Sequence, residues 1–134
     1  MMKLLKLIIA LCIIASCNTQ KKQKIELEYI AINYSSVCCG PQSDVPVRKF
    51  LSSYAKKNRQ KDFVVMVTSG LGREGEFTLH IEIEKNMKNK KDFLEQLGKA
   101  VQNQNNNRTE NDGYVYLEES VSPPRNNKIS PIQK

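Results

Sequence analysis

Two adjacent cysteines, Cys38 and Cys39, are the side chains of this chain best suited to metal or redox chemistry. A pair of thiols can bind a soft metal ion or exchange a disulfide, and a nearby helix N-terminus can lower a thiol pKa. Two thiolates alone leave a soft cation under-coordinated, however. Adjacent cysteines can instead close a strained disulfide, with Gly40-Pro41 completing the turn. The sequence favours a structural or incidental pair over a redox or metal site, and over pairing between molecules.

The single histidine, His80, is the candidate for a general base at neutral pH. It lies between Thr78 and Glu82 on the polar side of an alternating segment, so the side chain of Glu82 points the same way. Glu26 or Glu28 could approach them if the first and third strands were neighbours. Such a patch could bind a cation weakly, but a base or a metal ligand needs partners that converge on it. We therefore favour a solvated sheet face with cross-strand charge pairs.

No other motif supports catalysis. Residues 70–75, GLGREG, match the letters of a dinucleotide-binding loop, but such a loop must open a helix, and here an alternating segment follows. The glycines instead predict a hairpin turn. The chain has no C-x-x-C or H-E-x-x-H motif and no arrangement of serine, histidine and acid. We therefore expect a protein that is not an enzyme and needs no cofactor.

Residues 1–17, MMKLLKLIIALCIIASC, have the features of an export signal: two lysines, an apolar segment over residues 7–14, and small residues before a cleavage site. The letters IASC at residues 14–17 resemble the lipobox of bacterial lipoproteins. The resemblance implies cleavage between Ser16 and Cys17 and attachment of lipid to the Cys17 thiol. It also implies a lipoprotein anchored in a membrane of the bacterial cell envelope and facing the periplasm.

Length argues against a transmembrane anchor in the same segment. As a helix, residues 7–16 would span about 15 Å, against about 30 Å for the hydrocarbon core of a bilayer. Removing residues 1–16 from the 134 leaves 118, which is enough for one domain. We predict a lipidated tether over residues 17–24, a single domain over 25–119 and a disordered tail over 120–134.

The mature chain is basic. The formal net charge of +7 falls to +5 when Lys3 and Lys6 leave with the signal. Contact with anionic lipid head groups or other acidic envelope polymers is the natural use of this charge, and no compact basic and aromatic patch indicates nucleic-acid binding. Only Cys38 and Cys39 remain free for pairing, so no long-range disulfide is available and the core must hold the fold.

Hydrophobic periodicity predicts an α+β domain. Apolar residues recur at helical spacing after Ser43-Asp44 and after residues 86–89, and Asp44 or Ser43 could cap the first helix and Asn86 or Asn89 the second. The asparagine-rich segment 103–111 predicts a loop. Strands are predicted over residues 25–34, 63–68, 76–84 and 114–117. This order matches the ferredoxin-like βαββαβ plan, a four-stranded antiparallel sheet with two helices on one face. The predicted core residues are Ile30, Ile32, Phe50, Leu51, Tyr54, Val65, Phe77, Leu79, Ile81, Phe93, Leu94, Leu97 and Val115.

These features favour a small binding or interaction domain, held at a membrane by the lipid on Cys17, that docks on another envelope protein. The open face of the sheet or an edge strand would make the contact, by analogy with other ferredoxin-like domains. The alternative is a thiol-based metal-binding or redox module that uses Cys38 and Cys39. A third hypothesis is a small enzyme on the polar face around His80. Loss of His80 would abolish that activity, loss of the thiols would abolish a thiol function, and neither loss would abolish binding.

Overall fold

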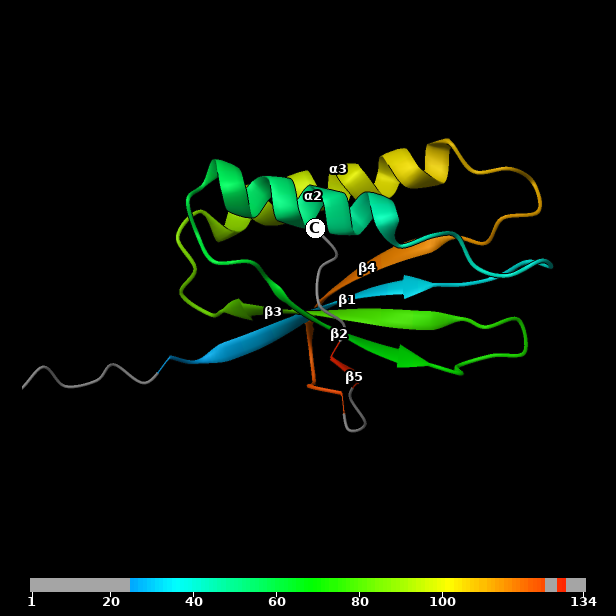
Figure 1. Cartoon of the computed structure of the whole chain (residues 1–134), viewed down its shortest axis with the longest axis horizontal. Helices are drawn as coiled ribbons and strands as arrows, with labels where there is room; N and C mark the ends of the chain where they lie inside the picture. Colours follow the sequence, from blue (N-terminus) through cyan, green and yellow to red (C-terminus); the bar gives the residue numbers. More distant parts are fainter. Residues whose placement is uncertain (1–24, 125–127, 130–134) are drawn as a thin grey trace, which may run out of the picture.

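The computed structural model describes residues 25–124 and 128–129, which form one sheet covered on one face by two helices (Figure 1). Neighbouring strands are antiparallel, in the order β4-β1-β3-β2-β5. The elements are β1 (Leu27–Tyr34), α2 (Val45–Lys57), β2 (Val64–Ser69), β3 (Phe77–Glu84), α3 (Lys90–Asn106), β4 (Val115–Val121) and β5 (Lys128–Ile129). The ferredoxin-like βαββαβ prediction is confirmed, and the two-residue β5 adds a short fifth strand at the β2 edge.

The segment before Ile25 lies outside the described residues, and with it the predicted signal, the lipid site at Cys17 and the tether. Within the ranges that are described, no helix is both long and apolar enough to span a membrane.

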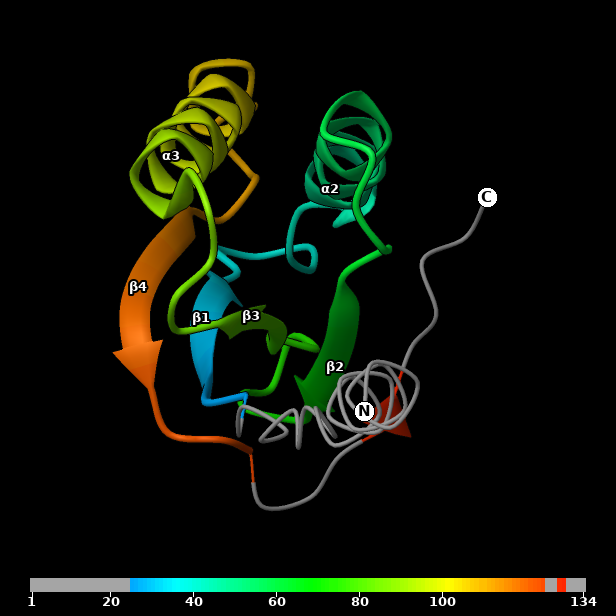
Figure 2. The ribbon, with the colours of Figure 1, turned by 90° about the vertical axis from the view of Figure 1, so that its left-hand side faces the viewer.

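The core lies between the sheet and the helices, because the apolar faces of both layers meet there (Figure 2). Phe93 of α3 is fully buried at its centre, with its ring centroid 5.0 Å from that of Tyr54 and 4.9 Å from that of Phe63. Phe50, Phe77 and Leu94 of the predicted core are only partly buried; the other predicted core residues are buried. The structure adds buried side chains that are not among the predicted core residues, including Tyr34, Val47, Ala55, Phe63, Ile83 and Val101.

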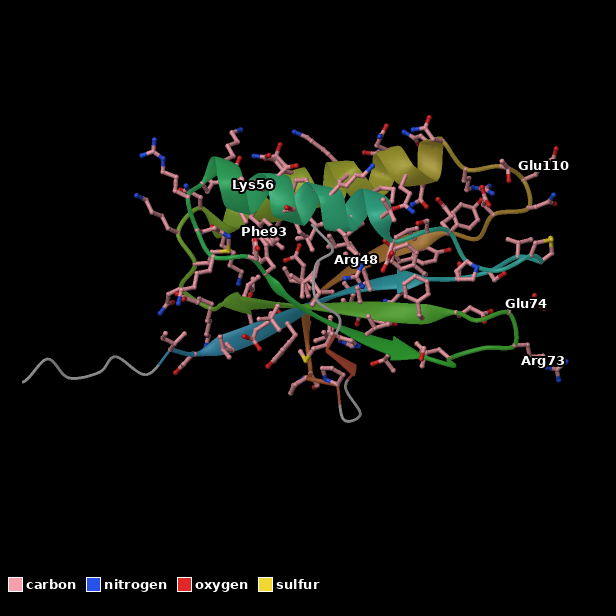
Figure 3. The ribbon with its side chains drawn as sticks, viewed as in Figure 1. Arg48, Lys56, Arg73, Glu74, Phe93 and Glu110 are labelled. Atoms are coloured by element: carbon pink, nitrogen blue, oxygen red, sulfur yellow. The ribbon has the colours of Figure 1, made fainter. Side chains whose placement is uncertain are left out.

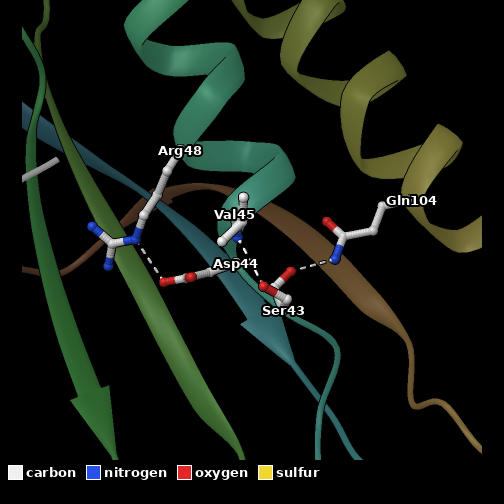
Figure 4. A network of polar contacts seen from close by, with 5 residues as sticks. All are labelled: Ser43, Asp44, Val45, Arg48 and Gln104. Carbon is white, nitrogen blue, oxygen red and sulfur yellow. Dashed lines mark hydrogen bonds and ion pairs between the residues drawn. The ribbon is translucent and has the colours of Figure 1, made fainter. Parts of the chain in front are cut away.

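The asparagine-rich segment was predicted wrongly at its start, because α3 continues to Asn106. The extra turn is held by hydrogen bonds to backbone groups of other elements. Gln104 donates to the carbonyl of Ser43 at 2.7 Å (Figure 4), and the amide of Asn105 donates to and accepts from the backbone of Val115 at 2.8 and 2.9 Å. These side chains satisfy backbone groups at the start of α2 and of β4. The polar residues at the end of α3 therefore make contacts between elements and do not form a loop.

The start of α2 is fixed by the same network. Asp44, one of the two predicted candidates, occupies the N-cap position, but its side chain makes no capping hydrogen bond. Its carboxylate accepts a hydrogen bond from Nε of Arg48 at 2.6 Å, while the hydroxyl of Ser43 accepts from the N–H of Val45 at 3.3 Å (Figure 4). The loop before α2, which carries the two cysteines, is therefore anchored at its end.

The end of the chain differs from the predicted boundary at residue 119 and the predicted disordered tail. Val121 completes β4 opposite Tyr29, and Lys128–Ile129 pair with β2. Between Glu118 and Val121 the register shifts, with Ser120 at a φ of 59°, which is a β-bulge. A bulge bends its strand, and the segment that follows crosses the face of the sheet opposite the helices (Figure 2). The tail was predicted to be disordered because it lacks apolar periodicity. Its pairing with β2 uses backbone hydrogen bonds, which do not require that periodicity.

Candidate functional site

The face of the sheet that the helices leave uncovered, here the open face, carries polar side chains at its centre. Because side chains alternate along a strand, Ala31 and Asn33 of β1 share this face with Thr78 and His80 of β3. Glu118 of β4 lies opposite Ala31 on the other side. Neighbouring strands therefore bring together residues that are far apart in the sequence.

A cavity of about 480 Å³ lies over this centre. Alanine is small, so the position of Ala31 between Glu118 and His80 leaves a hollow with polar side chains on both sides. Val121 at the end of β4, Pro124 after it and Leu71 in the turn between β2 and β3 add apolar residues to the lining. The full lining is Ala31, Asn33, Thr68, Leu71, Thr78, His80, Glu118, Val121 and Pro124.

Hydrogen bonds hold the polar side chains of the cavity in place. Thr78 donates to the side-chain oxygen of Asn33 at 2.7 Å, and the amide of Asn33 donates to Glu118 at 3.4 Å. The hydroxyl of Thr68 lies 3.2 Å from Nε2 of His80. Thr78 is buried although it lies on the open face, so this arrangement is partly shielded from water.

His80 lines the cavity, and its buried ring nitrogen Nδ1 has no hydrogen-bond partner among the described residues. Burial lowers the pKa of His80, so the imidazole is neutral at pH 7. A neutral imidazole can donate through one nitrogen and accept through the other, so Nδ1 can take either role toward a partner.

The lowered pKa makes the stability of the fold depend on pH. Below about pH 6.5 the unfolded chain takes up a proton on His80 that the folded chain resists, so the free energy of unfolding should fall as the pH falls. His80→Gln keeps a hydrogen-bonding side chain but cannot titrate. Urea unfolding at pH 7.5 and pH 5.0 should show a smaller loss of stability for His80→Gln than for the unchanged protein. Equal losses of stability in the two proteins would contradict the lowered pKa of His80 in the folded chain.

Glu82 does not join His80 in the cavity. Its carboxylate accepts a hydrogen bond from the hydroxyl of Tyr29 at 3.2 Å. Strands β1 and β3 are neighbours, which was the condition for Glu26 or Glu28 to approach His80. Both glutamates instead form ion pairs with lysines: Glu26 with Lys85 at 2.9 Å, and Glu28 with Lys90. His80 and Glu82 therefore lie on the same face of the sheet, but they do not contribute to the same cavity.

Cys38 and Cys39 lie at the far end of the domain, in the loop between β1 and α2. Both are exposed free thiols, with their sulfur atoms 2.9 Å apart. The hydrogen bond between Cys38 and Cys39 raises the pKa of Cys38, and desolvation and the nearby charges of Glu74 and Asp112 raise it further. This direction is opposite to the lowering that a helix N-terminus can produce. Among the described residues, no group of three histidine, cysteine or acidic side chains could hold a metal ion.

The glycine-rich segment 70–75 is the turn between β2 and β3, as predicted. Gly70 and Gly75 have φ angles of 76° and 85°, which side chains disfavour. The N–H of Leu71 donates to the carbonyl of Glu76 at 3.2 Å, which closes the hairpin. The side chain of Leu71 reaches the cavity on the open face, so this turn contributes to the site.

The residues of the cavity that we did not predict include Ala31, Asn33, Thr68 and Glu118. Asn33 and Ala31 occupy the alternate positions of a strand that we did predict, and their alternation was a usable signal. Glu118 lies beyond the predicted end of the last strand at Leu117, so its position on the open face was hidden.

The chain matches no protein-family model, no curated protein and no solved structure in the comparisons made with them.

Proposed function

We propose that this chain is a lipid-anchored protein of the bacterial cell envelope that binds another envelope protein through the open face of its sheet. In this account it is not an enzyme. Its anchor is the lipid on Cys17, as the resemblance to a lipobox implies, and it faces the periplasm. The binding site is the cavity over Ala31.

One observation carries the binding part of the proposal. The buried Nδ1 of His80 has no partner among the described residues, at a cavity where the other polar side chains are held in hydrogen bonds. A buried polar group without a partner costs free energy, so a ligand that supplies one would bind favourably.

Charge indicates which part of a partner fits. Glu118 is the acidic side chain of the lining, none of the described residues that line the cavity is Lys or Arg, and His80 is neutral at pH 7. A lysine or arginine side chain of the partner would complement the charge of Glu118 and could donate to His80. The partner is therefore expected to insert a basic side chain.

A charge reversal at Glu118 tests this proposal. Glu118→Lys should reduce recovery of the partner from detergent-solubilised membranes by about tenfold or more, because it places like charges together. Glu119→Lys is the matched control: it makes the same change of charge one residue along β4, at an exposed side chain that does not line the cavity. Equal recovery by the two variants would argue against the cavity as the binding site.

The 2.9 Å separation of the two sulfur atoms favours a second candidate function, thiol-based redox exchange or metal binding at Cys38 and Cys39. The two candidates can be separated by one substitution. Cys38→Ser would abolish a thiol function but should leave recovery of the partner unchanged, because the two sites are at different places on the domain. Metal bound at one per chain and lost in Cys38→Ser would support the second candidate.

A further inference from the structure

The two ends of the domain carry opposite charge. The chain enters the described region at one end, here the basic end, which is formed by residues 25–28, 56–62 and 84–91 (Figure 1). These segments contain eight basic and four acidic residues, for a net charge of +4. The loops at the other end, residues 35–44, 70–76 and 107–114, contain two basic and five acidic residues, for a net charge of −3. Lys56 at one end and Glu74 and Glu110 at the other mark the difference in Figure 3.

Most basic side chains of the basic end are available to a ligand. Two are paired: Lys85 with Glu26, and Lys90 with Glu28. The others are exposed and form no ion pair with any residue of the described ranges. They are Lys56, Lys57, Arg59, Lys61, Lys88 and Lys91.

Exposed apolar side chains lie among these lysines. Ile25, Leu27 and Val64 are 63%, 47% and 42% exposed, which is high for large apolar residues. They line a hollow of about 530 Å³ together with Lys61 and Lys88, and the acidic side chains of Asp62, Glu82 and Glu84 line it as well. A surface with apolar side chains beside lysines suits the boundary between lipid head groups and acyl chains, where both kinds of side chain are favourably placed.

The position of the predicted anchor brings this end close to a membrane. Ile25 is eight residues after Cys17. A fully extended chain of eight residues spans about 28 Å at most, so lipid on Cys17 would keep the basic end within that distance of the bilayer. Anionic head groups would then attract the end with net charge +4 and repel the end with net charge −3.

We propose that the basic end docks on anionic lipid head groups. The strands run between the two ends of the domain (Figure 1), so the sheet stands upright on the membrane, its open face turned sideways toward a partner in the same membrane. Cys38 and Cys39 lie at the end that points away. The inference goes beyond the proposed binding function, and it relies on the proposed anchor only to bring the domain to the surface.

Acetylation of lysines on vesicles tests the docking. Full-length protein, purified from membranes in detergent, is added to vesicles of phosphatidylcholine alone or of phosphatidylcholine and phosphatidylglycerol in equal parts. The rate of acetylation is then measured for each lysine by mass spectrometry. Lys56, Lys61 and Lys88 should react about fivefold more slowly on the anionic vesicles, and about 0.5 M salt should remove the difference. Lys49 and Lys99, which lie away from the basic end, should react equally on both.

Two triple variants with the same change of charge provide the control. Replacing Lys56, Lys61 and Lys88 by glutamate should abolish the slow acetylation of Lys57 on anionic vesicles. Replacing Lys49, Arg73 and Lys99 by glutamate should leave it intact. Equal rates on the two vesicle types, or equal effects of the two triple variants, would overturn the inference. Flotation with neutral vesicles reports anchoring separately, so a failure of the anchor and a failure of docking give different results.

Discussion

Gly113→Ala should lower the free energy of unfolding by about 3 kcal/mol, since overpacking a tight site forces the backbone to move. Gly113 is buried where the chain enters β4, against the residues that follow β1. A Cβ atom here would overlap the backbone carbonyl of Ser35 and would lie 2.7 Å from Cα of Ser36. These are backbone atoms, so no side chain can rotate away to relieve the overlap.

Hydrogen bonds prevent the two segments from separating. The N–H of Ser35 donates to the carbonyl of Tyr114 at 2.9 Å, and the N–H of Tyr114 donates to the hydroxyl of Ser35 at 2.9 Å. Gln42 donates to the carbonyl of Gly113 itself at 2.6 Å. Making room for a methyl group would break some of these bonds.

Gly98→Ala is the matched control for this prediction. A Cβ at Gly98 would meet nothing within 4 Å, and the residue lies within α3. Alanine should therefore stabilise the domain by up to about 1 kcal/mol, through its higher helix propensity. Urea unfolding followed by circular dichroism measures both variants. Similar stabilities for Gly113→Ala and the unchanged protein would show that Gly113 does not lie as close to Ser35 and Ser36 as described.

The second large effect concerns the anchor. Cys17→Ser should abolish lipid attachment and the lipoprotein type of cleavage completely, because a hydroxyl cannot form the thioether link. Cys12→Ser should leave both intact, because Cys12 lies within the segment that the resemblance predicts to be removed. Intact-mass measurement of the membrane fraction compares the variants. The proposal would fail if the unchanged protein carried no added acyl mass.

Alternation of apolar residues was sufficient to predict β3 and the face that it turns to the core. In β3, Leu79, Ile81 and Ile83 are buried beneath the helices while His80 lies on the open face, as the alternation indicated. This pattern is reliable because a one-residue shift would expose every apolar side chain. The helical spacing of Leu51 and Tyr54 identified α2 for the same physical reason.

The features that we missed depend on contacts between distant segments. Gln104 and Asn105 extend α3 because they bond to Ser43 and Val115, and no local pattern reveals those partners. The last strand was predicted to end at Leu117, but pairing with β1 carries it through the polar Glu118 to Val121. The cavity depends on this extension, since its lining joins Glu118 and Val121 to residues of β1 and β3.

Cross-linking from the open face tests the central claim most directly. Tyr116 lies opposite Asn33 on this face and is 54% exposed, so a photoreactive phenylalanine derivative can replace it with little change of shape. The same derivative at Lys99, exposed in α3, probes the helical layer. Irradiation of intact cells should give one adduct of defined mass from position 116 and none from position 99. Adducts from position 99 with none from position 116 would contradict binding through the open face.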